Sequence, residues 1–223
     1  AVLEDAAEMG LKVVRTWGNL DAGVKTDKVS DKGYTVFTDS VDGSGEKEGV
    51  YYQYFDADLG RPVVNEGEDG LQKLDYALYK AEQEGIKLLI TFTNNWEAFG
   101  GMGQYVQWAK LAGENVSGHD DFYTNETIKG WYKDYIKTLL NHENVYTGVK
   151  YKDDPTIFSW ELANEPRCES DAGCENNTVV KWATEMSAYV KSIDNNHMLA
   201  VGDEGFYNYG YNDFPEGDHK YVY

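Results

Sequence analysis

The sequence predicts an α/β fold, a (β/α)8 barrel, of which about four central strands lie within the 223 residues. Helical and strand patterns alternate along the chain, and this alternation specifies a parallel sheet with right-handed crossovers. Polar or aromatic residues follow each predicted strand, at the end where barrel proteins build their functional sites. An open doubly wound sheet would also alternate, but Gly100, Gly101 and Gly103 lack the spacing of a dinucleotide-binding turn.

The chain begins with a predicted helix and strand. Residues 1–9 have a helical pattern that ends at Gly10, where a positive φ is wanted. Residues 11–17 follow as a strand that ends in polar and aromatic side chains. Because no strand precedes the first helix and four strands are only half of a barrel, we expect a single barrel domain over residues 1–223 that is incomplete at both ends.

A long polar insertion follows the first strand. Residues 21–70 are rich in glycine and show no helical period, and segments of this kind are functional or disordered. The alternation of Tyr34, Val36 and Val41 favours a small hairpin packed on the barrel mouth. The insertion is either a wall of the cleft or a surface excursion without contact to a ligand.

Three repeats of helix then strand make up the rest of the chain. Apolar residues recur at helical spacing in three segments, which are residues 70–84, 125–140 and 177–193. Short apolar runs predict buried parallel strands over residues 86–93, from Thr156 onward, and over residues 197–201. A glycine-rich loop, residues 99–103, is expected between the first of these strands and the next helix.

The segment from Thr156 to Cys168 changes from apolar to polar within a few residues. Its second half carries four polar groups around Pro166, namely Glu161, Asn164, Glu165 and Arg167. Polar groups at the end of a buried strand cost folding free energy unless they have hydrogen-bond partners, or they are kept for a function. They form either a hydrogen-bonded cluster that closes the strand or part of an active site.

In a barrel, the ends of all four strands converge on one pocket. The residues there are Arg15 and Trp17, then Asn94, Asn95 and Trp96, then Asn164, Glu165 and Arg167, and finally Asp203 and Glu204. Carboxylates, amides and aromatic faces suit a sugar, whose rings stack on aromatics and whose hydroxyls bond to amides and acids. The four scattered histidines are interpreted as surface or structural residues, and we expect neither a metal nor a cofactor.

The composition limits the classes of partner. The formal net charge is -19 and only three basic residues are arginine, which argues against nucleic acid and anionic membranes. No apolar run approaches the roughly 20 residues of a membrane helix. Residues 1–10 carry acids and lack the apolar core of a signal peptide, as mature secreted chains also do. We expect a monomer with a neutral ligand.

Cysteines and sequons bear on the compartment. Cys168 and Cys174 bracket a five-residue loop, and we favour a disulfide that pins this loop over two free thiols in a cytosolic protein. Asn115, Asn125 and Asn176 begin glycosylation sequons. Both features favour a secreted, extracellular protein, although such triplets also arise by chance.

The string from Trp160 to Cys168, with Asn164-Glu165-Pro166 at its centre, resembles the acid/base motif of glycoside hydrolase clan A. In more detail it is similar to the fungal family 5 endo-β-1,4-mannanases. The resemblance covers almost the whole chain and includes residues 12–18, 61–72, 86–88, 94–101 and 202–206. Asn95-Trp96 stands where many family 5 cellulases carry a histidine, which lowers a cellulase interpretation.

The resemblance implies roles for the strand-end residues. It makes Glu165 the general acid/base, and the nucleophilic glutamate is expected on the seventh barrel strand, C-terminal to this chain. It makes Arg15 the partner that keeps the nucleophile ionised. The residues implied to bind substrate are Arg15, Trp17, Asn95, Trp96, Asn164, Arg167 and Glu204.

The implied activity is retaining endo-hydrolysis of β-1,4-mannosidic bonds in mannan, galactomannan or glucomannan. Two alternatives stay open on the residues alone. One is an endo-β-1,4-glucanase of the same clan. The other is a non-catalytic polysaccharide-binding protein, which stays open because the 223 residues do not include an identified nucleophile.

Overall fold

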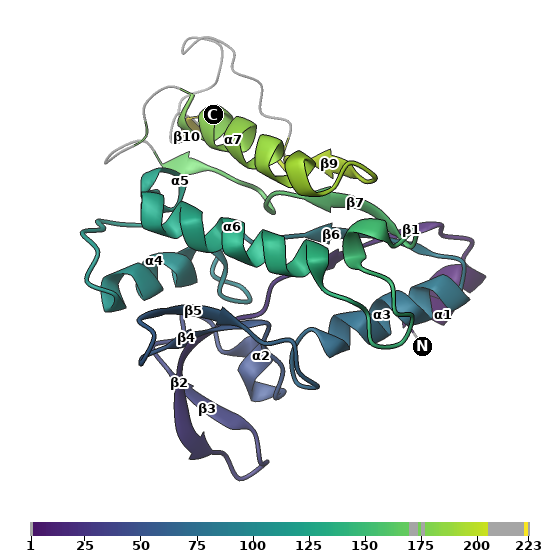
Figure 1. Ribbon diagram of the computed structural model, residues 1–223, viewed down its shortest axis with the longest axis horizontal. Helices are drawn as coiled ribbons and strands as arrows, with labels where there is room; N and C mark the ends of the chain where they lie inside the picture. The colour runs from purple at the N-terminus through teal and green to yellow at the C-terminus, as the bar shows by residue number, and fades with distance from the viewer. Residues whose placement is uncertain (1, 170–173, 175–176, 205–220, 223) are drawn as a thin grey trace.

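The computed structural model describes residues 2–169, 174, 177–204 and 221–222. Its central element is a parallel sheet with the strand order β1-β6-β7-β9 (Figure 1). The strands are β1 (Val13–Trp17), β6 (Lys87–Thr91), β7 (Ile157–Glu161) and β9 (Met198–Ala200). All three pairings are parallel, so the four predicted strands and their direction are confirmed.

Helices connect these strands as the sequence pattern predicts. They are α1 (Val2–Glu8), α3 (Gln72–Gln83), α6 (Glu126–Asn141) and α7 (Thr178–Ile193), and Figure 1 shows α6 and α7 along one face of the sheet. Asn125 caps α6 because its side-chain oxygen accepts a hydrogen bond from the Ile128 amide at 3.0 Å. In the described part of the chain, every helix is too short or too polar to cross a membrane.

The segment after β6 differs from the prediction. Instead of a glycine-rich loop over residues 99–103, helix α4 (Gly101–Leu111) begins inside it, and α5 (Asp121–Thr124) follows. Met102, Tyr105 and Trp108 recur at helical spacing and are completely buried, so burial of this face stabilises the helix. The glycines obscured this pattern, because glycine lowers helix propensity by about 1 kcal/mol relative to alanine.

Residues 21–70 contain more regular structure than the predicted hairpin. They form a second sheet with the order β3-β2-β4-β5 and the short helix α2 (Ser44–Lys47). The strands are β2 (Asp21–Val29), β3 (Thr35–Thr38), β4 (Gln53–Asp56) and β5 (Arg61–Val64). The hairpin is the antiparallel pair of β2 and β3, but β2 also pairs in parallel with β4, a contact that local patterning does not reveal.

The remaining short elements are η1 (Tyr151–Asp153), β8 (Cys168–Glu169) and β10 (Tyr221–Val222), and β8 and β10 pair antiparallel. An aromatic core packs between the central sheet and its helices. Within it, Phe92 stacks on Trp160 at 5.1 Å between ring centroids, and Tyr132 stacks on Trp182 at 5.8 Å. This core holds the strands in place, so the opposite face of the sheet and the strand ends are positioned for a site.

Candidate active site

The sheet register brings the strand ends together. Trp17 pairs with Thr91, Thr91 with Glu161, and Glu161 with Ala200, so the four strands end at one level. A further parallel bridge joins Asn94 to Asn164 beyond the strands. Residues paired across a sheet share a face. The polar residues that follow these strands therefore gather at one edge, as the sequence predicts.

Arg15 lies on the face opposite the helices and reaches across β6. Its Nη2 is 2.5 Å from Glu161 Oε1 and 2.7 Å from Asn164 Oδ1, and its Nε lies 3.2 Å from Glu161 Oε1. The Arg15 guanidinium also lies 5.7 Å from the centroid of the Trp17 ring. Charge-assisted bonds of this kind are short and fix orientation. Arg15 is thus held between two residues of the β7 segment.

The Asn164 side chain is buried and fully oriented by the protein. Its oxygen accepts from Arg15, and its Nδ2 donates to Asn94 Oδ1 at 2.9 Å. Asn94 Oδ1 in turn accepts from the Trp96 amide at 3.2 Å. These bonds fix which way the amide of Asn164 points. The Asn164 amide is therefore held in one orientation, and its contact with a ligand hydroxyl stays a prediction.

Glu165 follows Asn164 with φ at +51°, a left-handed conformation that is uncommon for a residue with a side chain. Its amide donates to the Gly202 carbonyl at 2.9 Å, and its Oε2 accepts from the Trp96 indole Nε1 at 2.5 Å. Gly202 has φ at +92°, and a Cβ there would lie 1.8 Å from the Ala163 oxygen. Glycine is required at position 202 for this approach.

Arg167 and Glu204 meet across the gap between the ends of β7 and β9, as their strand order predicts. Arg167 Nε lies 2.5 Å from Glu204 Oε2, and the Arg167 guanidinium lies 5.4 Å from the centroid of the Trp96 ring. Trp96 is 41% exposed, so one aromatic surface stays open beside Glu165. The structure therefore shows the contact between Arg167 and Glu204, whereas the ligand-binding role of this pair stays a prediction.

Trp17 and Asn95 line the same edge through contacts within the protein. The Trp17 ring packs 5.5 Å from the Phe99 ring. Asn95 is buried, and its Oδ1 accepts from the Arg167 amide at 3.1 Å. Asn95 therefore shapes the loop that carries Arg167, and its direct contact with a ligand stays a prediction.

Two residues that the sequence did not single out support the loop after β6. His119 Nε2 lies 2.8 Å from the Asn95 carbonyl oxygen. Asp21 Oδ2 accepts from the Gly101 amide at 3.2 Å, and burial raises the pKa of Asp21 to about 7 although bonds from Gln53, Asn19 and Gly101 lower it. Both partners lie far away in sequence, so no local pattern identifies them.

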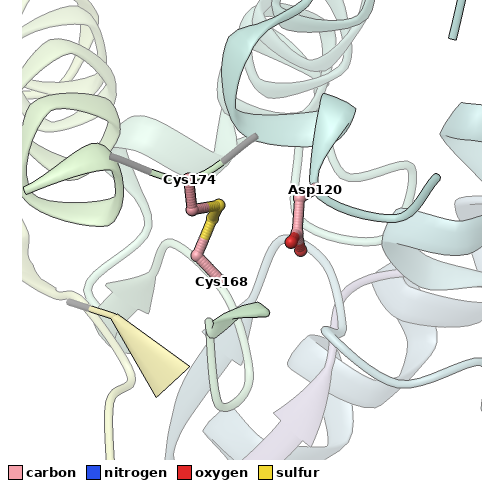
Figure 2. Close-up of side chains that lie close together, drawn as sticks. All are labelled: Asp120, Cys168 and Cys174. Carbon is pink, nitrogen blue, oxygen red and sulfur yellow. A yellow bond between two sulfur atoms is a disulfide. The ribbon is translucent and has the colours of Figure 1, made fainter. Parts of the chain in front are cut away.

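The predicted disulfide between Cys168 and Cys174 is present, and Figure 2 shows Asp120 beside it. The two sulfurs are bonded to each other, so they do not offer the thiolates that a metal ion needs. Asn115 is exposed, whereas the Asn125 side chain caps α6, and Asn176 lies outside the described residues. Occupancy of these sequons stays a prediction.

Fold and site together define a class, an α/β protein with carboxylate, amide and aromatic side chains gathered at the carboxyl ends of its parallel strands. Residues 47–219 match the family model described as GH family 5 beta-mannosidase-like. The chain belongs to this glycoside hydrolase family.

Curated relatives agree with this assignment. Mannan endo-1,4-beta-mannosidase 7 of Arabidopsis thaliana is 42% identical over 204 residues, which cover 92% of this chain and 39% of that protein. Mannan endo-1,4-beta-mannosidase 1 of Oryza sativa subsp. japonica is 42% identical over 207 residues, which cover 93% and 40%. The chain thus spans about two fifths of the length of these relatives.

Solved structures agree in fold. The endo-1,4-beta-mannanase of Rhizomucor miehei superposes with a TM-score of 0.77 at 41% identity, over 94% of this chain and 52% of that one. The hyperthermostable endo-1,4-beta-D-mannanase of Thermotoga petrophila gives 0.70 at 42% identity, over 97% and 54%. The four parallel strands are part of a (β/α)8 barrel, which confirms the predicted fold class.

Proposed function

We propose that the protein is a retaining endo-β-1,4-mannanase that acts on mannan, galactomannan or glucomannan. The observation that carries the proposal is the end of β7, where Asn164 is oriented by Arg15 and Glu165 lies against Trp96. The family and the printed activities of the relatives support it.

The chemistry follows from this arrangement. Retaining glycosidases place two carboxyl groups about 5–5.5 Å apart, one as acid/base and one as nucleophile. Glu165 donates a proton to the leaving oxygen and later takes one from water. Asn164 bonds the sugar 2-hydroxyl, a contact that strengthens as the oxocarbenium ion develops. The nucleophile is expected from a later strand, next to Arg15.

The deciding experiment is hydrolysis by the full-length protein of β-mannan and of soluble cellulose in parallel. We expect cleavage of mannan within the chain, with a β-configured product appearing first in a proton NMR time course. Preferred cleavage of cellulose would establish the glucanase instead. Binding to mannan without any cleavage would establish a polysaccharide-binding protein.

The first mutation to test is Glu165→Gln. It removes the transferable proton but keeps the shape of the side chain, so turnover of mannan should fall by about 10²–10⁴-fold while ligand binding persists. An aryl mannoside with a good leaving group should lose less, because its departure needs less protonation. Glu82→Gln, on the exposed side of α3, is the matched control. Unchanged mannan turnover in Glu165→Gln would remove the acid/base assignment.

We also propose that the protein is secreted and monomeric. The disulfide between Cys168 and Cys174 supports secretion, because such bonds persist in oxidising compartments. Thiol titration of the denatured, unreduced protein, followed by peptide mapping, should find both residues blocked. Free thiols at both positions in protein isolated from its native source would contradict the proposed compartment.

A further inference from the structure

We propose that Glu161 is a positioning residue for the reaction, which acts through Arg15 on the geometry of the acid/base strand end. The inference rests on the proposed function for its kinetic consequences. Its structural part, the placement of Arg15 by Glu161, stands on the contacts of the described residues alone.

The Glu161 carboxylate accepts hydrogen bonds along one edge of the Arg15 guanidinium, from Nε and Nη2. Its Oε1 lies 2.5 Å from Nη2, and its Oε1 and Oε2 lie 3.2 Å and 3.3 Å from Nε. The Glu161 side chain is only 8% exposed, whereas that of Arg15 is 43% exposed. A long, half-exposed arginine has many rotamers, and a buried carboxylate that takes two of its donors selects one of them.

The fold keeps space for this carboxylate. Glu161 is the last residue of β7 and is paired on both sides, with Thr91 and with Ala200. Its carbonyl oxygen accepts from the Phe92 amide at 2.9 Å. A Cβ at position 202 would lie 2.8 Å from Glu161 Cγ and 2.9 Å from its Cδ, so Gly202 leaves room for the side chain. The carboxylate is thus a fixed point of the site.

The placement of Arg15 carries through to the residue beside the acid/base. The same Nη2 that bonds Glu161 donates to Asn164 Oδ1 at 2.7 Å, and Asn164 precedes Glu165. Among the residues that the structure describes, Arg15 Nη1 makes no hydrogen bond. With Nε and Nη2 held by the β7 segment, Nη1 stays available to the nucleophilic carboxylate that the proposed reaction needs.

Glu161 therefore needs no contact with substrate to affect the reaction. If the Glu161 carboxylate is removed, the Arg15 side chain can move away from Asn164 and from the nucleophile. Asn164 and the nucleophile then lose the contact that fixes their geometry. Misplacement of catalytic groups by about 1 Å costs on the order of 10²-fold in rate. The loss should fall on kcat, because neither Glu161 nor Arg15 is needed to bind the distant sugars of a long chain.

A double-mutant cycle in the full-length protein tests the inference. Glu161→Gln keeps shape and one acceptor, and should lower kcat on mannan by about 10–100-fold with KM within about twofold. Arg15→Lys keeps the positive charge but removes the fork, so adding Glu161→Gln in that background should cost less than about threefold. Equal factors in both backgrounds would show that Glu161 acts independently of Arg15.

A matched control separates positioning from stability. Trp160→Phe lies on the opposite face of the same strand and removes the 2.7 Å bond from Trp160 Nε1 to Asp194. We expect it to lower the melting temperature while leaving kcat within about twofold. A fall in kcat as large as that of Glu161→Gln would make loss of stability the explanation and overturn the proposal.

A crystal structure of the full-length Glu161→Gln variant decides the structural part whatever the substrate. We expect Arg15 Nη2 to have moved out of hydrogen-bond distance of Asn164 Oδ1. If that contact persists at its present 2.7 Å, Arg15 is positioned by other groups and the inference is wrong. A wild-type protein without glycanase activity would instead overturn the proposed function, and this structure would still decide the role of Glu161.

Discussion

Glu165 combines an uncommon backbone conformation with a polar partner on its side chain. A left-handed φ in a residue other than glycine costs on the order of 1–3 kcal/mol and persists where the surroundings impose it. Here the Gly202 carbonyl holds the Glu165 amide, and Trp96 bonds the carboxylate. Asp39, Phe99 and Asn177 also have a positive φ, and of these four residues Glu165 is the one that the proposed reaction uses.

Arg167 offers a test of the leaving-group side of the site. Removing it in Arg167→Ala takes away a guanidinium that contacts Glu204 and lies over Trp96. We expect slower cleavage of short mannooligosaccharides, a smaller effect on long mannan, and less transfer to acceptor sugars relative to hydrolysis. Chromatography of the products over time measures all three.

Arg61→Ala is the matched control for Arg167→Ala, because Arg61 is an exposed arginine on β5. The melting temperature should change little in either variant, since pairs near the surface contribute about 0–1 kcal/mol. Identical rates and an identical product pattern in Arg167→Ala would reduce the pair with Glu204 to a surface ion pair.

At the scale of the elements, the sequence predicts what depends on local pattern. The apolar run that contains β6 and the helical spacing of Leu71, Leu74 and Leu78 are local signals, and both elements form as predicted. The sequence does not predict helix α4, because glycines lie at its start, and it does not predict the pairing of β2 with β4, because the partners are far apart in sequence. Tertiary burial decides such cases, not propensity.

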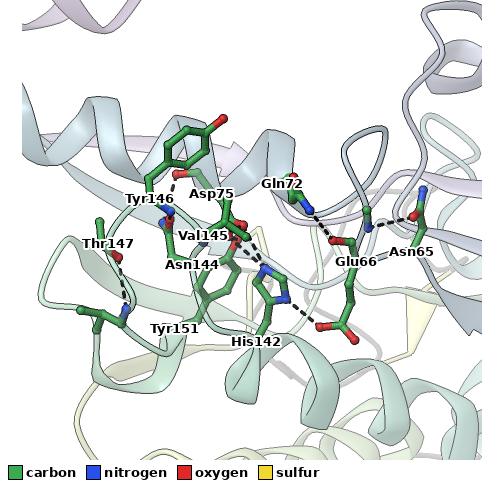
Figure 3. A network of polar contacts seen from close by, with 12 residues as sticks. Asn65, Glu66, Gln72, Asp75, His142, Asn144, Val145, Tyr146, Thr147 and Tyr151 are labelled. Atoms are coloured by element: carbon green, nitrogen blue, oxygen red, sulfur yellow. Dashed lines mark hydrogen bonds and ion pairs between the residues drawn. The ribbon is translucent and has the colours of Figure 1, made fainter.

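A polar network shows how distant elements are joined (Figure 3). Asp75 of α3 is completely buried, and its carboxylate accepts from Tyr151 Oη at 2.5 Å and contacts His142 Nε2 at 3.0 Å. His142 Nδ1 lies 2.7 Å from Glu66 Oε2. The network ties α3 to the segment between α6 and β7.

The network predicts a pH-dependent contribution to stability. Burial lowers the pKa of His142, but the carboxylates of Asp75 and Glu66 outweigh it and raise the pKa above 6.5. Because the folded pKa exceeds the unfolded one, the stabilisation is complete below about pH 6.5 and is lost as pH rises through the folded value. The difference in melting temperature between wild type and His142→Gln should therefore shrink as pH rises from 5.5 to about 9.

His197→Gln is a control for this prediction. His197 is also buried and contacts a carboxylate, that of Asp194, but it lies outside the network of Asp75. A melting-temperature difference between wild type and His142→Gln that grows with pH would contradict the assigned sign. Differential scanning fluorimetry across the pH range is sufficient for the comparison.

At the scale of the molecule, the sequence predicts the class of fold and the edge on which the site lies. It also predicts that Arg167 and Glu204 meet, because both follow neighbouring strands. It does not predict the pair of Arg15 and Glu161, whose strands are separated by β6 and whose positions differ by 146 residues. Such a contact depends on side-chain reach within the assembled sheet, which no pattern along the chain encodes.

Asp21 gives the last prediction, which concerns the stability of the whole molecule. Asp21 is 3% exposed, and burial raises its pKa to about 7 from 3.8 although hydrogen bonds from Gln53, Asn19 and Gly101 lower it. An acid whose folded pKa exceeds the unfolded one binds its proton more tightly when folded. Stability from this group is therefore greatest below about pH 4, falls as pH rises toward 7, and is constant above it.

The comparison of wild type with Asp21→Asn isolates the pH-dependent contribution of Asp21 to the free energy of unfolding, because the asparagine amide cannot ionise. As pH rises from about 4 to 8, wild type should lose about 4 kcal/mol of unfolding free energy relative to the variant, since one pKa unit corresponds to 1.36 kcal/mol. Urea unfolding at both pH values measures the difference. Asp58→Asn removes an exposed charge of the same sign and should show no such trend. Parallel pH profiles for wild type and Asp21→Asn would mean that Asp21 stays ionised in the folded protein, its charge stabilised by the three donors that also hold the loop after β6.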